Sequence, residues 1–202
     1  MGRAYNCALS SAIGLRFPRS IYNGRMDIVE QTDAAHAHLK SQQGGAGVLS
    51  GTAGDIRHLM NAPVYYEDTD FSGFVYHANY LKFAERGRSN LLRLCGIEHT
   101  DLLDLEPQLA FVVGHMDIDF LAPARIGDML LVETVFTKMR GARLLAEQVI
   151  KRDATPLWQA RVEAAIVDLD GRPRRLPKAL AEKMQAHLGA PLLGPVSPKT
   201  AP

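Results

Sequence analysis

Apolar residues in the middle of the chain first recur with the period of a helix. Five of them follow one another at spacings of four and three: Tyr80, Ala84, Gly87, Leu91 and Leu94. This spacing places side chains on one helix face, so we predict a helix from about Ala78 with that face turned inward. Gly87 would let the helix approach a neighbouring backbone closely, and Gly96 would end it.

From residue 112 the apolar period becomes that of a strand. The apolar residues Val112, Met116, Ile118 and Phe120 alternate with residues 113, 115, 117 and 119, three of them polar. Three more strand-like stretches follow, at residues 129–137, 143–151 and 157–169, with connections short enough for hairpins. We therefore predict a meander of four antiparallel strands. A short strand at residues 64–67 precedes the helix, and a short helix at residues 177–187 closes the pattern.

One long helix with an apolar face needs a sheet to cover it. The pattern predicts an α+β fold of two layers, in which an antiparallel sheet wraps around one central helix. Residues 144–150 and 158–166 suggest an outer sheet face with little charge. We expect that face to meet a partner, and we expect at least a homodimer formed by pairing of edge strands.

Composition narrows the class of protein. The chain has 202 residues, 47% of them hydrophobic, a formal charge of +1 and two cysteines. We expect one domain, neither nucleic-acid binding nor a membrane span, and a reducing, cytoplasmic location.

The two ends differ from the middle. Residues 1–25 carry four arginines and no acid, as transit peptides do, and residues 41–54 have the glycine and serine content of a linker. We expect residues 1–57 to be a disordered or weakly structured extension, a targeting segment, or sequence upstream of a true start at Met26 or Met60. The domain would then occupy residues 58–188, and residues 189–202 would form a flexible tail.

The loop between the first strand and the helix concentrates candidate chemistry. Its letters DTDFSG, from Asp68, resemble a calcium loop, but Asn79 stands where the last ligand should be a glutamate. A phosphatase Asp-x-Asp site would need a parallel sheet, and the serine-hydrolase elbow and the zinc-protease motif are missing. The remaining interpretation is a carboxylate beside a helix N-terminus. Its backbone N–H groups could hold a thioester oxyanion while the carboxylate attacks the carbon or activates water.

The same stretch carries a family resemblance. The letters YYEDTD from Tyr65, then GFVYHANY from Gly73, resemble the signature of hotdog-fold acyl-CoA thioesterases, in particular the YbgC-like group related to 4-hydroxybenzoyl-CoA thioesterases. Later blocks resemble the same group, and the similarity runs from Pro63 to Leu188: FVV from Phe111, APAR from Ala122, MRG from Met139 and LPK from Leu176.

The resemblance implies roles for individual residues. Asp70 matches the catalytic carboxylate, His77 and Tyr66 match residues beside it, and the amide of His77 matches the group that polarises the carbonyl. The resemblance also implies an acyl pocket at a dimer interface and a basic surface for the CoA nucleotide. Arg140, Arg143 and Arg174 are candidates for that surface by position only.

The resemblance also implies a function. It predicts hydrolysis of short-chain or aromatic acyl-CoA to free acid and CoA, without cofactor or metal, in a homodimer or homotetramer. It implies a link to the Tol–Pal envelope system as well. The alternative is a non-catalytic hotdog module that binds acyl-carrier protein or an envelope-linked partner.

Other polar residues have simpler interpretations. Asp68 is typical of a residue that caps a turn. Glu85 is a second candidate acid, but a salt bridge with Arg88 or Lys82 accounts for it as well. His115 and Cys95 fit structural positions better than reactive ones.

Overall fold

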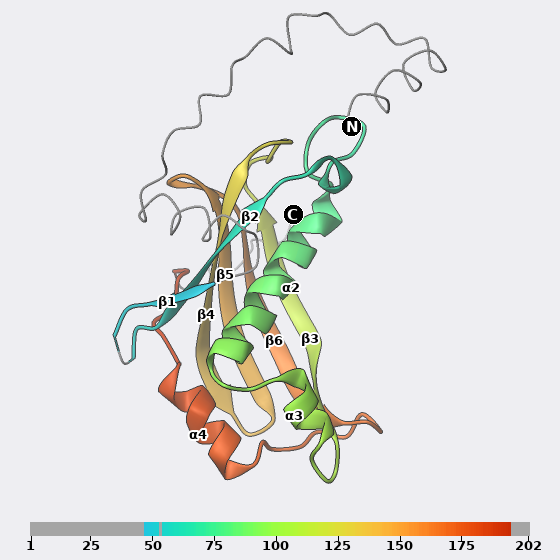
Figure 1. The fold of residues 1–202 in the computed structure, drawn as a ribbon, viewed down its shortest axis with the longest axis vertical. Helices are drawn as coiled ribbons and strands as arrows, with labels where there is room; N and C mark the ends of the chain where they lie inside the picture. Colours follow the sequence, from blue (N-terminus) through green and yellow to red (C-terminus); the bar gives the residue numbers. More distant parts are fainter. Residues whose placement is uncertain (1–46, 53, 195–202) are drawn as a thin grey trace, which may run out of the picture. The chain divides into compact units, whose positions relative to one another are not determined.

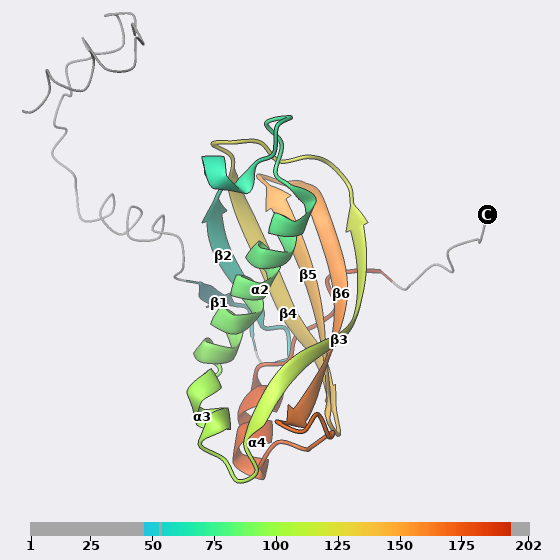
Figure 2. The same ribbon diagram turned by 90° about the vertical axis from the view of Figure 1, so that its right-hand side faces the viewer.

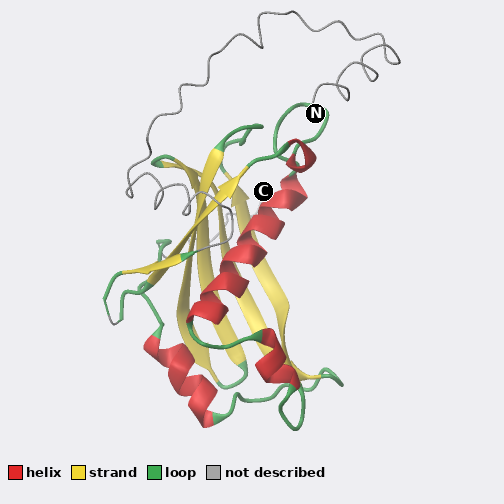
Figure 3. Ribbon diagram, viewed as in Figure 1, coloured by secondary structure: helices red, strands yellow, loops and turns green. Residues whose placement is uncertain are grey.

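The computed structural model describes residues 47–52 and 54–194, and within them it confirms the predicted α+β architecture. Six strands form one antiparallel sheet in the order β1-β2-β4-β5-β6-β3. The long helix α2 (His77–Leu94) lies against one face of this sheet (Figures 1 and 2). The strands are β1 (Val48–Ser50), β2 (Arg57–Pro63), β3 (Leu109–Phe120), β4 (Met129–Arg140), β5 (Arg143–Arg152) and β6 (Thr155–Asp168). The short helices α3 (His99–Leu103) and α4 (Lys178–Ala186) complete the unit (Figure 3).

Helix α2 packs through the face that its spacing predicts. Tyr80, Ala84, Gly87 and Leu91 are buried. A Cβ atom on Gly87 would lie 2.7 Å from Oγ1 of Thr134 and 3.0 Å from Cγ1 of Val132, so the glycine permits the close approach to β4. The prediction for Leu94 is wrong: its side chain is 40% exposed, while Ile97, after the turn at Gly96, is buried.

The strand order corrects the predicted meander. Strands β4, β5 and β6 are joined by hairpins, but β3 pairs with β6 rather than with β4, from Leu109 opposite Asp168 to Phe120 opposite Trp158. Residues 121–128, here called the crossing segment, therefore carry the chain from one edge of the sheet back to β4. Local spacing could not reveal this, because an eight-residue connection is compatible with either a hairpin or a crossover.

The start of the domain also differs from the prediction. The strand expected at residues 64–67 lies earlier, at β2, whose inward residues His58, Met60 and Ala62 are buried. Tyr66–Asp68 instead form a single 3-10 turn. Strand β1, inside the range we expected to be an extension, pairs with β2. Residues 1–46 lie outside the described part of the chain.

The outer face of the sheet carries more charge than we predicted. Thr134 and Gln148 face α2, where they lie beside Gly87. Because successive strand residues point to opposite faces, their neighbours Glu133 and Glu147 face away from α2. Glu133 pairs with Arg57 and Lys151, and Glu147 pairs with Arg161 at 3.3 Å. The backbone N–H of Leu193 donates to Glu147 at 2.7 Å, so the chain after α4 crosses this face. The prediction of an outer face with little charge is therefore wrong.

Membrane crossing finds no support in the part of the chain that the structure describes. None of its helices is both long enough and apolar enough to span a bilayer.

Candidate active site

The loop before α2, residues 65–76 and here called the site loop, folds back on itself as a tight turn. The amide of Asp70 donates to the carbonyl of Phe74, and the amide of Gly73 donates to the carbonyl of Asp70, both at 3.0 Å. Gly73 has a φ of +77°, which a side chain would disfavour. The carbonyl of Asp68 accepts from the Asn79 side chain at 2.9 Å. The turn is therefore held at a fixed place beside the start of α2.

The crossing segment supports the site loop from the other side. The amide of Val75 donates to the carbonyl of Ala124, and the guanidinium of Arg125 lies 4.4 Å from the centre of the Phe74 ring. The amide of Ala124 donates to the hydroxyl of Tyr80 at 2.8 Å. One stretch of backbone thus ties the site loop to the inner face of α2.

Asp70 lies at the exposed tip of the turn. Its Oδ1 accepts two hydrogen bonds from Ser72, at 2.8 Å from the amide and 2.5 Å from the hydroxyl. These two donors, with a smaller effect of the charge on His77, lower the pKa of the Asp70 carboxyl. Asp70 is therefore a carboxylate at neutral pH, as a nucleophile or general base must be.

His77 is the first residue of α2, and its backbone N–H has no partner within the helix because it belongs to the first turn. Its ring centre lies 4.3 Å from that of Tyr76 and 6.5 Å from that of Phe120. A pocket of about 300 Å³ opens beside it. The lining residues are Val75, His77, Tyr80, Phe120, Leu121, Ala122 and Pro123. Asp70, the His77 amide and this pocket thus lie around one end of α2.

Tyr66 and Asp68 play different parts in the site loop. Tyr66 is 84% exposed, and its carbonyl accepts from the hydroxyl of Thr69. Its ring is available to a bound molecule, but no contact between it and Asp70 is found among the described residues. Asp68 is buried, and its Oδ2 accepts from the Tyr65 amide at 2.9 Å, which is the capping role expected for it.

The three candidate arginines lie together, but far from Asp70. Arg140 and Arg143 face each other at the β4–β5 turn, and the amide of Arg174 donates to β6 beside them. Strand β4 has 12 residues and starts opposite Pro63, next to the site loop, so its far end is roughly 35–40 Å away. Arg143 pairs with Glu163 and Arg174 with Asp168. Within one chain these arginines and Asp70 cannot hold the same thioester group.

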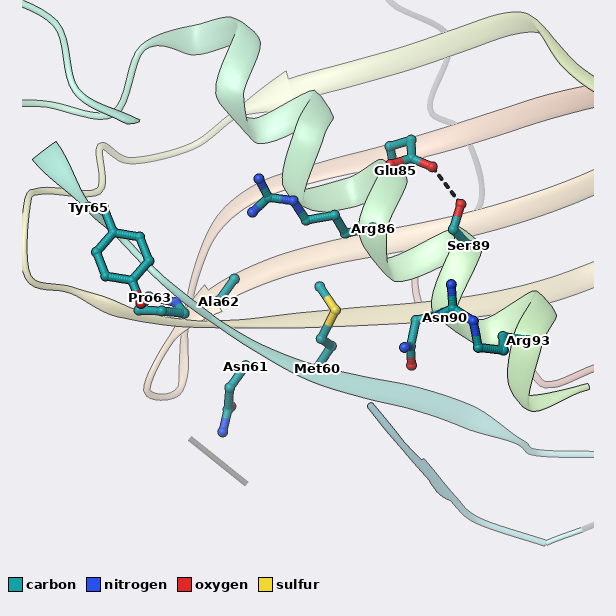
Figure 4. A pocket seen from close by; sticks show the side chains of 10 residues that line it. All are labelled: Met60, Asn61, Ala62, Pro63, Tyr65, Glu85, Arg86, Ser89, Asn90 and Arg93. Atoms are coloured by element: carbon teal, nitrogen blue, oxygen red, sulfur yellow. Dashed lines mark hydrogen bonds between the residues drawn. The ribbon is translucent and has the colours of Figure 1, made fainter. Parts of the chain in front are cut away.

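A larger groove lies on the other flank of α2, between the helix and β2 (Figure 4). Its volume is about 430 Å³, and Arg86 and Arg93 project from the helix beside it. Glu85, also in the lining, accepts from the Ser89 hydroxyl at 2.5 Å, and this contact accounts for the second candidate acid. The groove contains neither Asp70 nor His77, so its size alone does not make it the reaction site.

Sequence reasoning missed two parts of this site. Ser72 was not recognised as the partner of Asp70, although an aspartate two residues before a serine is typical of a side chain that bonds the backbone of its own turn. The support from the crossing segment depends on pairing between distant residues, for which no local signal exists.

Comparisons with known proteins identify the family. Residues 64–184 match the model of the thioesterase-like superfamily. The acyl-CoA thioesterase YbgC of Haemophilus influenzae is 46% identical over 116 residues, which cover 57% of this chain and 85% of that protein. The acyl-CoA thioester hydrolase YbgC of Escherichia coli is 40% identical over 124 residues, 60% of this chain and 91% of that protein.

Solved structures show the same fold. The crystal structure of a probable thioesterase from Bartonella henselae is 47% identical and superposes with a TM-score of 0.58, covering 60% of this chain and 99% of that one. The match to the superfamily model, residues 64–184, includes the site loop, α2 and strands β3 to β6. The chain therefore belongs to the thioesterase-like superfamily, and within it to the YbgC-like thioesterases of the hotdog fold.

Proposed function

We propose that this acyl-CoA thioester hydrolase acts on short-chain or aromatic acyl groups through Asp70. The observation that carries the proposal is the exposed carboxylate of Asp70, whose lowered pKa keeps it ionised. It lies in the loop before α2, where the His77 amide has no partner within the helix. Membership of a thioesterase family supports the reaction class.

The chemistry needs few groups. The His77 amide donates to the carbonyl oxygen of the thioester and stabilises negative charge as it develops there. Asp70 either attacks the carbonyl carbon itself or takes a proton from the water that attacks it. In both cases the carbon–sulfur bond breaks and the electron pair leaves with the CoA thiolate. A thiolate departs without strong acid assistance, so a carboxylate and a donor suffice.

The pocket beside His77 supports a small acyl group. Phe120 presents its ring edge-on to Tyr80, with ring centres 5.8 Å apart, and half of its surface is exposed. A flat apolar wall in a pocket of about 300 Å³ suits a short chain or a single aromatic ring.

We also propose that the active protein is a homodimer or homotetramer. Strand β3 is an edge of the described sheet, and Val112, Val113 and Phe120 on it are about half exposed. Pairing of two β3 edges would bury these side chains. Arg140, Arg143 and Arg174 are then proposed to contact the nucleotide of a CoA whose thioester lies on a partner subunit, because their own Asp70 is too distant.

Replacement of Asp70 tests the proposal. Asp70→Asn should lower turnover by roughly 100-fold or more, since it removes a nucleophile or general base. The unfolding temperature should stay the same, because the side chain is exposed. Turnover is measured by thiol release from a panel of acyl-CoA thioesters, and the unfolding temperature is measured by thermal unfolding.

The matched control is Glu67→Gln, which neutralises another exposed acid in the same loop. It should retain wild-type turnover. Undiminished thiol release by Asp70→Asn would remove Asp70 from the reaction.

The second candidate is a hotdog module that binds acyl-carrier protein or an envelope-linked partner without hydrolysis. The exposed basic side chains of Lys82, Arg86 and Arg93 along α2 favour it, because they suit an acidic partner. A cytoplasmic location and a link to the Tol–Pal system are part of either proposal. The location rests on the two cysteines of the chain, and the link rests on the family alone. Capture of acyl-carrier protein by wild-type chain that cleaves no acyl-CoA above background would favour this second function.

A further inference from the structure

We infer that Ser72 is a positioning residue for Asp70: its hydroxyl and amide hold Oδ1 of the carboxylate, and they leave Oδ2 as the oxygen that reacts. The inference rests on the proposed function, because it assigns the orientation of the proposed catalytic group.

The contacts define which oxygen is held. Oδ1 of Asp70 accepts from the Ser72 amide at 2.8 Å and from the Ser72 hydroxyl at 2.5 Å. Among the described residues no hydrogen bond reaches Oδ2. Two donors on one oxygen oppose rotation of the carboxylate about its last bond, so its two oxygens keep different environments. The oxygen without donors keeps its lone pairs for a carbonyl carbon or a water molecule.

The direction of the Ser72 hydroxyl proton follows from a second contact. The Phe74 amide donates to Oγ of Ser72 at 3.3 Å. Since a hydroxyl has one proton, and Oγ is already an acceptor from Phe74, that proton is directed to Asp70. A short chain of donors thus runs from the Phe74 amide through Ser72 to the carboxylate. The turn held by Gly73 brings these three groups together.

Among the described residues, the elements around Asp70 carry further charged groups. His77, at the start of α2, has a charge that acts on it. On the crossing segment, Arg125 lies over the Phe74 ring, and Asp128 is paired with Arg152. Within the site loop, Glu67 is exposed and Asp68 bonds to the Tyr65 amide. Ser72 makes the largest contribution to the lowered pKa of Asp70, so its removal has a measurable signature.

A purely structural role would have a different outcome. An aspartate that bonds the backbone two residues on is a common turn former, and such a turn needs only the amide bond. Ser72→Ala keeps that amide and removes only the hydroxyl, so it separates the two roles. Because Ser72 is exposed at the loop tip, the variant should unfold at the wild-type temperature.

The experiment compares Ser72→Ala, Ser72→Thr and Thr69→Ala in the full chain. Thr69 is the matched control, because its hydroxyl lies in the same loop but donates to the Tyr66 carbonyl. Turnover and KM are measured against pH with the best acyl-CoA substrate. The carboxyl of Asp70 is titrated separately by carbon NMR, which needs no activity.

We expect Ser72→Ala to lower kcat about tenfold with little change in KM, as loss of orientation of a catalytic group does. The pKa of Asp70 should rise, so the acidic limb of the rate profile should move to higher pH. Ser72→Thr should restore both quantities, and Thr69→Ala should change neither.

Two failures are distinguishable. If Ser72→Ala leaves kcat and the titration of Asp70 unchanged while Asp70→Asn is inactive, the role of Ser72 is disproved and the proposed function stands. If the wild-type chain hydrolyses no acyl-CoA, the function fails. If Ser72→Ala then also leaves the titration of Asp70 as it is in the wild type, the contact itself is overturned.

Discussion

The middle of α2 and the loop before its first residue are built in opposite ways. In the middle, the buried Gln148 donates to the Ala84 carbonyl and to the Thr134 hydroxyl, and accepts from Arg88 at 2.7 Å. In the loop, the exposed carboxylate of Asp70 bonds to Ser72 of its own turn. The first region holds the helix to the sheet through distant residues, and the second keeps a charged group in water. The comparison shows that α2 is fixed to the sheet at its centre, which leaves its first turn and the loop before it available for the reaction.

The largest expected effect comes from filling the space at Gly87. Gly87→Leu should destabilise the domain by about 3 kcal/mol or more, because its side chain would displace Thr134 and Val132 on β4. Urea unfolding measures the change. In the site loop, a Cβ atom on Gly73 would lie in open space. Gly73→Ala should therefore lower the free energy of unfolding only by the cost of a positive φ, about 1 kcal/mol. Equal losses in the two variants would break the contrast between the regions.

Loss of the hydrogen bonds that Gln148 makes under α2 should have the next largest effect on stability. Gln148→Met keeps the volume but leaves the Ala84 carbonyl and the Arg88 guanidinium without this partner, which should cost about 2–3 kcal/mol. Gln159→Met is the control, because Gln159 is half-buried and makes one bond, to Asp119. A Gln148 variant as stable as its control would show that these hydrogen bonds do not anchor the helix.

Between pH 7 and pH 5, a pH effect on stability should arise in the core, because the Asp70 carboxyl, whose pKa is lowered, stays ionised over that range. His58 is fully buried, its Nε2 lies 2.8 Å from Oδ1 of Asn90, and burial lowers its pKa. The unfolded chain therefore binds a proton near pH 6.5, while the folded chain does so only at lower pH. Stability should fall as pH drops below about 6.5.

His58→Gln keeps an N–H donor for Asn90 and cannot titrate. The variant should lose less unfolding free energy than the wild type between pH 7 and pH 5, measured by urea unfolding. Parallel losses in the two proteins would assign the pH dependence to other groups.

The smallest expected effect is at the tip of the site loop. Phe71 is fully exposed in the single chain, so Phe71→Ser should change stability by less than about 0.5 kcal/mol. Sedimentation of the variant and of the wild type measures whether the two assemble equally. A loss of the assembled form would show that this ring contacts a partner subunit.

Periodicity predicted the parts of the fold that depend on neighbours in the sequence. The inner face of α2 from Tyr80 to Leu91, the close approach at Gly87, the turn at Gly96 and the presence of β4 to β6 follow from such patterns, and the structure confirms them. The position of β3 beside β6 does not follow, because pairing between distant strands leaves no local trace. The outer face was misjudged for a related reason, since Glu147 and Arg161 neutralise each other only once their strands are paired.

The site divides in the same way. Asp70 and His77 came from a motif, and the structure places them at one end of α2, while their roles stay predictions. The three arginines were chosen by position in the sequence, and the structure places them at the far end of the sheet. The length of β4 separates the arginines from Asp70, and no local pattern in the sequence indicates that separation.

The crossing segment has a consequence for how such a chain can change. A few added residues at the β4–β5 turn, around Gly141, would lengthen a hairpin at the end of the sheet far from the site loop. The same addition between residues 121 and 128 would shift Ala124 and Arg125, on which the loop rests. Added length should therefore leave the site loop in place at the first connection and displace it at the second. An engineer who wants to switch the reaction on and off would insert a sensor at the second.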